Sequence, residues 1–168
     1  MKTDKKQFSE PTTINKAEAH NNNQLSMIPS TPIPIELSDI VKNDNEYLSY
    51  LVWKGADIRY GYLSEEIKGR ITNELNVIKK KGVAGYFLMF WNIVRAAREE
   101  LDVFVGPGRG RTPGSIVAYC LRIIDIDPIQ YGLSFECFYS TQSKGLPDIA
   151  IDVESEGRHK VINWMKKY

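Results

Sequence analysis

The stretch "VGPGRGRTPGS", residues 105–115, places four glycines and two arginines directly before the apolar run at residues 116–121. Glycine has no Cβ atom, so a glycine-rich turn lets a bulky group approach the backbone closely. A helix that begins after such a turn offers free backbone N–H groups and partial positive charge. Arg109 and Arg111 can add paired hydrogen bonds to phosphate oxygens. The stretch predicts an anion-binding loop, with a solvated turn as the alternative.

The residues around the last glycine set the expected start of the following helix. Pro113 and Gly114 suit a first helical turn, and Thr112 suits the N-cap of a helix that continues to about Ile123. The loop does not have Walker spacing, because no Gly-Lys-Ser/Thr closes it, and Arg111 stands where the third glycine of G-x-G-x-x-G would be. Spacing alone therefore leaves both interpretations open.

A second candidate site follows in "LPDIAIDV", residues 146–153, whose alternating pattern predicts a strand. Alternate residues of a strand share a face, so Asp148, Ala150 and Asp152 are expected to point the same way. Neighbouring carboxylates on a strand suit a pair of Mg²⁺ ions about 3.5 to 4 Å apart. Here the middle residue is alanine, and Asp148 and Asp152 would lie roughly 13 Å apart along the strand. Two aspartates flanking a half-buried strand remain the simpler interpretation.

Hydrophobic periodicity predicts the remaining elements. Helices are expected at residues 46–61, 64–81, 92–101 and 157–168. The second of these has Ser64 as its cap and ends at Gly82. Strands are expected at residues 86–91, where the run "YFLMFW" suits burial on both faces, and at residues 102–105. The mixture predicts an α+β fold.

Composition limits the class of protein. The 168 residues are 42% hydrophobic and 26% charged with a net charge of +1, which is typical of one globular domain and not of a general polyanion binder. No apolar run approaches a membrane span and no secretory signal is recognised, so a cytoplasmic location is expected. The polar residues 1–30 are predicted to be a flexible arm before a domain at residues 31–168. Cys120 and Cys137 are expected to be buried thiols.

Several blocks of the chain, in order, resemble one family. The blocks are "EYLSYLVWKGADIRYG", "ITNELNVIKKKGVAGYFLMFW", "VGPGRG", "GSIVAYCLRIIDIDPIQYGLSFE", "LPDIAIDV" and "GRHKVINWMKKY". From about Pro32 to Tyr168 they resemble the palm region of the bacterial DNA polymerase III alpha subunit. The resemblance implies an incomplete polymerase-beta-like nucleotidyltransferase palm, with a small mixed sheet flanked by helices. It also implies DNA-templated nucleotidyl transfer by a two-metal mechanism.

The resemblance implies roles for individual residues. The triphosphate cradle would be formed by Gly108, Arg109, Gly110, Arg111 and Ser115. Asp148 would be the catalytic metal ligand and Asp152 a further metal residue, with Mg²⁺ as the cofactor. A dNTP, primer-template DNA and other polymerase subunits would be the partners.

The sequence departs from the family pattern at the expected site. Arg111 replaces a serine, Cys137 replaces an arginine, and Ala150 stands where a metal-holding aspartate belongs. The chain also ends before the third catalytic aspartate and the template-binding segments of the family. We therefore expect a fragment without polymerase activity, with two alternatives: a non-catalytic phosphate-binding remnant or a poorly folded relic. An uncovered sheet edge would also favour self-association.

Overall fold

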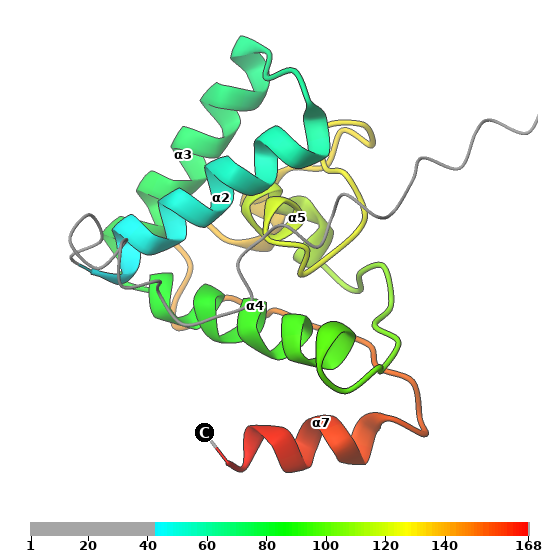
Figure 1. Ribbon diagram of the computed structural model, residues 1–168. Coiled ribbons are helices and arrows are strands. Elements are labelled where there is room, and N and C mark those ends of the chain that lie inside the picture. The colour runs from blue at the N-terminus through cyan, green and yellow to red at the C-terminus, as the bar shows by residue number, and fades with distance from the viewer. Residues whose placement is uncertain (1–42, 168) are drawn as a thin grey trace, which may run out of the picture.

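The computed structural model describes residues 43–167 and shows a group of packed helices joined by extended segments (Figure 1). The arm predicted at residues 1–30 lies outside the described residues. In the part of the chain that is described, no helix is long and apolar enough to cross a membrane.

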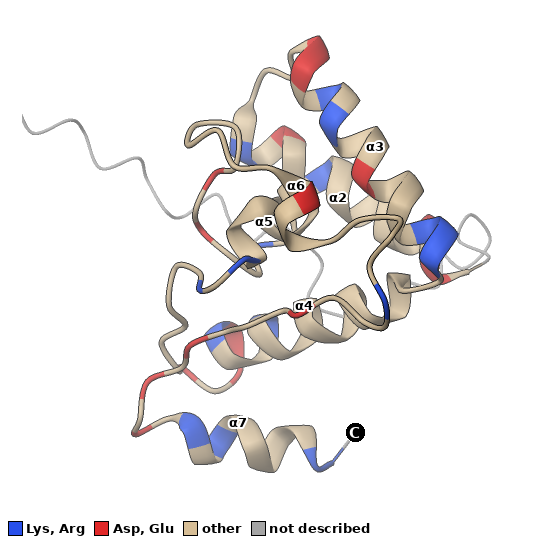
Figure 2. Ribbon diagram, turned by 180° about the vertical axis from the view of Figure 1, so that it is seen from behind, with Lys and Arg blue, Asp and Glu red and all other residues tan. Residues whose placement is uncertain are grey.

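Three long helices form the first half of the fold: α2 (Asp44–Tyr60), α3 (Glu65–Lys81) and α4 (Ala84–Glu99). The predicted limits of α3 are confirmed, because the Ser64 side chain accepts the Ile67 N–H and Gly82 adopts the left-handed conformation with φ of 66°. Acidic residues lie in its first turn and three lysines in its last turn (Figure 2). This distribution complements the helix dipole.

Short helices follow in the second half: the 3-10 helix η2 (Thr112–Gly114), α5 (Ile116–Cys120), α6 (Phe135–Phe138) and α7 (Arg158–Met165). The helix predicted from Thr112 to about Ile123 is thus divided. Ser115 rather than Thr112 caps α5, since the Ser115 side chain accepts the Ala118 N–H. The predicted last helix is confirmed as α7, although it is shorter than expected.

The core lies where α2 packs against α4 and α5. Helix α3 packs against both α2 and α5, and α7 runs beside α4 (Figure 1). The crossing of α2 and α5 is close at Gly55, where an added Cβ would collide with the carbonyl oxygen of Cys120. Any larger residue at this position would push α5, and the loop before it, away from α2.

The predicted α+β palm fold with a small mixed sheet is wrong. Residues 43–167 contain helices and no strand, and within them an antiparallel bridge pairs Val105 with Val153. The run at residues 86–91 belongs to α4, because Phe87, Trp91 and Val94 recur at helical spacing on its buried face. Residues 102–105 and 146–153 form no strand: Asp102 has a positive φ of 50°, the Ile149 N–H donates to the Pro147 carbonyl, and the two segments pair at the single bridge.

Two smaller expectations also change. Cys120 is buried as expected, whereas Cys137 is exposed, and both are free thiols. The argument for self-association from an uncovered sheet edge loses its basis in residues 43–167, because they form no sheet. Self-association itself stays a prediction.

Candidate functional site

The glycine turn has a conformation that depends on glycine. Gly108 has φ of 138° and Gly110 has φ of 62°. A Cβ on Gly108 would also lie 3.1 Å from Ile124 Cγ2 and 3.4 Å from Pro113 Cγ. The first of these φ values is in a region that L-residues rarely occupy. The turn therefore has a conformation that requires glycine, and its side chains Arg109 and Arg111 are exposed to solvent.

The glycine turn and the aspartate segment lie against each other. The Gly106 N–H donates to the Asp152 carbonyl at 2.9 Å, next to the bridge between Val105 and Val153. Thr112 Oγ1 accepts the Ala150 N–H at 3.0 Å. The two candidate segments thus lie side by side, without the sheet that the palm resemblance implies for this region.

Charged side chains from the two segments meet on an exposed rim. Arg109 Nη1 lies 3.2 Å from Asp152 Oδ1, and the two side chains are 66% and 57% exposed. Exposed ion pairs of this kind contribute only about 0 to 1 kcal/mol to stability. Asp148 and Arg111 are exposed as well. The predicted residues Gly108, Arg109, Gly110 and Arg111 of the turn thus lie beside Asp152. Asp148 is joined to the turn through its backbone, since Thr112 Oγ1 donates to its carbonyl oxygen at 3.4 Å.

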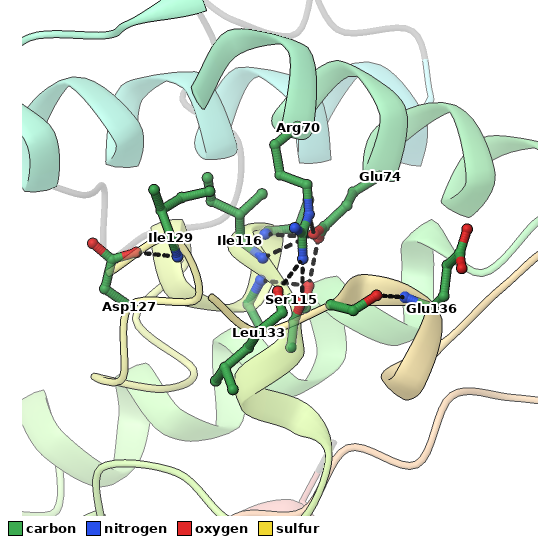
Figure 3. A network of polar contacts seen from close by, with 12 residues as sticks. Arg70, Glu74, Ser115, Ile116, Asp127, Ile129, Leu133 and Glu136 are labelled. Atoms are coloured by element: carbon green, nitrogen blue, oxygen red, sulfur yellow. Dashed lines mark hydrogen bonds and ion pairs between the residues drawn. The ribbon is translucent and has the colours of Figure 1, made fainter. Parts of the chain in front are cut away.

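Ser115, the remaining predicted cradle residue, lies away from this rim in a buried network. The residue is fully buried, and its Oγ donates to Glu74 Oε2 at 2.8 Å. The N–H groups of Ile116 and Val117 donate to the same carboxylate at 3.1 and 3.2 Å. Figure 3 shows the Glu74 side chain reaching from α3 to the start of α5. The chain's own carboxylate thus occupies the position in which a phosphate was expected.

Arg70 fixes this arrangement from one turn earlier on α3. Its Nε donates to Glu74 Oε1 at 2.7 Å, and its Nη2 donates to the carbonyl oxygens of Gly114 at 2.7 Å and Leu133 at 2.9 Å (Figure 3). One guanidinium therefore joins α3 to the end of the glycine loop and to residue 133. The network holds the backbone that follows the turn.

The charge state of Glu74 reflects two opposing causes. Burial raises the pKa of the Glu74 carboxyl, and this cause is the largest. The Arg70 guanidinium and the N–H groups of Ile116 and Val117 act in the opposite direction, because they stabilise the ionised form. The carboxylate accepts all the hydrogen bonds that surround it here, as expected for a group that satisfies the N–H groups of a helix start.

Sequence reasoning missed Glu74, although the sequence contains a signal for it. Ile67, Ile71 and Ile78 form the buried stripe of α3, and Glu74 falls between Ile71 and Ile78 in that stripe with an exposed fraction of 0%. A carboxylate at a core position of an amphipathic helix requires a buried partner. Arg70, four residues earlier, was in place to provide it.

The residues of the rim fit a metal ion only in part. Within residues 43–167 no group of three or more His, Cys, Asp or Glu side chains is arranged to hold a metal. Asp148 and Asp152 are the carboxylates on offer, and Asp152 contacts Arg109. Mg²⁺ commonly binds one or two carboxylates together with substrate phosphates and water. Within the described residues the rim therefore does not form a metal site from protein ligands alone.

The chain matches a known family. The sequence model of the family described as "Bacterial DNA polymerase III alpha NTPase domain" matches residues 46–168. The resemblance to the alpha subunit is thereby confirmed. The description names an NTPase domain, however, and with the helical fold it corrects the assignment to a palm region.

Individual relatives agree with this match. The DNA polymerase III subunit alpha of Borreliella burgdorferi is 42% identical over 139 residues, which is 83% of this chain and 12% of the relative. The corresponding subunit of Ureaplasma parvum is 35% identical over 168 residues, 96% of this chain and 17% of the relative. An error-prone DNA polymerase of Symbiobacterium thermophilum is 43% identical over 73% of this chain and 11% of its own length. The chain thus spans a small part of the relatives that it matches.

Proposed function

Because the chain belongs to the family of bacterial DNA polymerase III alpha subunits, we propose that its glycine turn binds the phosphates of a nucleoside triphosphate during DNA replication. Residues 106–111 form the binding segment, with Arg109 and Arg111 as the cationic contacts. Ser115 is not part of this proposal, because its hydroxyl is engaged by Glu74.

The observation that carries the proposal is the exposure of Arg109 above a turn that depends on glycine. In the described part of the chain, one nitrogen of its guanidinium contacts Asp152. A guanidinium carries five N–H donors, so the others can take phosphate oxygens. The backbone at Gly108 and Gly110 lets the phosphates approach without a side chain in the way.

We propose that Mg²⁺ enters this site together with the nucleotide. Asp148 would hold it, since its carboxylate is exposed and is not the partner of Arg109, and its backbone lies against the turn at Thr112. The ion would neutralise charge between the phosphate oxygens when bound. Asp152 would stay with Arg109 and orient the guanidinium.

Two-metal nucleotidyl transfer, which the family resemblance implies, requires carboxylates held next to each other. Ala150 separates Asp148 from Asp152 in this chain, and it offers no ligand. We therefore propose that the chain binds the nucleotide without transferring it unless other residues complete the site. DNA and other replication subunits are proposed as partners on the strength of the relatives' names.

Titration calorimetry with Mg²⁺-dATP tests the proposal. We expect Arg109→Ala to weaken binding about 10-fold or more, because it removes hydrogen bonds between charged groups. Lys80→Ala, which removes an exposed cation from the far end of α3, is the matched control and should leave binding unchanged. Equal affinity of the Arg109→Ala variant and the parent chain would contradict the proposal.

The same assay with Ala150→Asp tests whether Mg²⁺ binds at the aspartate segment together with the nucleotide. A carboxylate added between Asp148 and Asp152 should strengthen binding in the presence of Mg²⁺ and weaken it in its absence, because the added charge repels phosphate. Identical affinities with and without the ion in both chains would show that the aspartate segment does not bind a metal.

A further inference from the structure

An open groove lies beside the exposed ring of Phe104, next to the glycine turn. The Phe104 side chain is 68% exposed, two residues before Gly106 at the start of the glycine turn. The groove is lined by Arg98, Asp102, Val103, Phe104, Val105, Arg122, Asp125 and Glu154. Its floor is connected directly to the turn, since the Asp125 N–H donates to the Pro107 carbonyl at 2.7 Å.

The register of the single bridge places Phe104 on the same face as the phosphate rim. Val105 and Val153 pair and point inward, so the residues on either side of them point outward. The Glu154 N–H donates to the Phe104 carbonyl and the Gly106 N–H donates to that of Asp152. Phe104 therefore lies opposite Glu154, and Gly106 lies opposite Asp152. The two pairs are on the same face and are separated by about 7 Å along the chain. Asp152 is the residue that contacts Arg109.

The charges of the groove suit a different ligand group from those of the rim. Arg98 is already bonded to the Arg122 carbonyl at 2.7 Å and to Asp125 at 2.9 Å, so it forms part of the groove wall. The carboxylates of Asp102 and Glu154 repel phosphate and accept hydrogen bonds from hydroxyl and amino groups. An exposed aromatic ring offers a face for stacking a nucleobase.

We propose that the Phe104 groove takes the nucleoside end of the nucleotide whose phosphates lie at Arg109 and Arg111. The base stacks on Phe104, and the sugar hydroxyl or base amino groups face Glu154 and Asp102. This inference rests on the proposed phosphate-binding function and adds the part of the ligand that distinguishes a nucleotide from a bare polyphosphate. In this proposal Phe104 contacts the nucleoside and makes no contact with a bare polyphosphate.

The test compares two probes, Mg²⁺-dATP and Mg²⁺-tripolyphosphate, on the complete 168-residue chain. Phe104→Ala should weaken dATP binding about 5-fold to 100-fold, the range that base stacking gives, and should leave tripolyphosphate binding unchanged. Phe104→Tyr keeps an aromatic face and should retain dATP affinity. Tyr62→Ala removes another exposed ring, 80% exposed between α2 and α3, and should affect neither probe.

Each outcome has a distinct meaning. Loss of dATP affinity with intact tripolyphosphate affinity supports the inference. If Phe104→Ala lowers both affinities equally, or lowers neither, the groove does not contact the nucleoside and the inference fails. The proposed phosphate site would still be supported by the binding of tripolyphosphate to the parent chain. If the parent chain binds neither probe, the proposed function fails first and the inference with it.

Discussion

Two arginine–carboxylate pairs flank the same glycine loop and differ in almost every physical respect. Arg70 and Glu74 are joined at 2.7 Å, with exposed fractions of 22% and 0%, and their partners include backbone groups of α5 and the loop. Arg109 and Asp152 are joined at 3.2 Å by one nitrogen and are both exposed by more than half. The first pair therefore holds the loop in place, and the second leaves charged groups available to a ligand.

The difference shows that proximity to a glycine-rich loop does not identify a ligand-binding charge. Removal of one partner from a buried pair leaves a desolvated charge and is costly, whereas removal of an exposed partner costs little. The two pairs can therefore be separated by experiment, since one should affect stability and the other should affect binding.

The largest effect is expected from Glu74→Ala. The substitution leaves the Ser115 hydroxyl and the N–H groups of Ile116 and Val117 without their acceptor, and it removes the carboxylate beside Arg70. We expect the free energy of unfolding to fall by about 3 to 5 kcal/mol, measured by urea denaturation. Glu74→Gln keeps an acceptor of similar shape and should lose less. A loss below about 1 kcal/mol for Glu74→Ala would remove the distinction between the two pairs.

A middle effect is expected from Gly108→Ala. The new Cβ would meet Ile124 and Pro113 and force an unfavourable φ, so we expect a loss of about 1 to 3 kcal/mol in the same assay. Gly110→Ala is the matched control, because Gly110 also has a positive φ but nothing lies within 4 Å of its added Cβ. The control should lose less. Equal losses would mean that the close packing under Gly108 contributes nothing to the turn.

The smallest effect on stability is expected from Asp152→Asn. Loss of the exposed contact with Arg109 should change the free energy of unfolding by less than about 1 kcal/mol. Tripolyphosphate affinity should rise a few-fold in low salt, since the competing carboxylate on Arg109 becomes neutral, and the gain should shrink as salt is added. A large loss of stability would place this pair with the buried one and would break the comparison.

The sequence allowed the capped helices to be predicted and led to error where both faces of a segment are apolar. Ser64 and Gly82 mark the ends of α3 by local hydrogen bonds, which depend on neighbouring residues only. In α4 the exposed face also carries apolar residues such as Met89, so the run around it had no visible helical period. A strand was expected there because a continuous apolar run suits both structures when it is short.

The sequence identified the segments of the candidate site, but not which charged side chains are buried and structural and which are exposed. The strand expected at residues 146–153 is not formed, although its alternation agrees with the burial, since Asp148 and Asp152 are exposed and Ile149 is buried. The contact of Glu74 with the start of α5 joins residues 41 to 43 positions apart. Such a contact depends on how α3 packs on α5, which local pattern does not determine.

The placement of Glu74 has a kinetic consequence for whatever the loop binds. The chain's own carboxylate fills the enclosed position at the start of α5, so an incoming anion is left with contacts that solvent and salt can reach. Fields at such a surface are screened within about 8 Å at physiological ionic strength. A ligand held by such contacts dissociates quickly, and the occupied fraction of the site follows the ligand concentration in solution. We therefore expect a phosphate bound as proposed to exchange rapidly with solvent rather than to be retained.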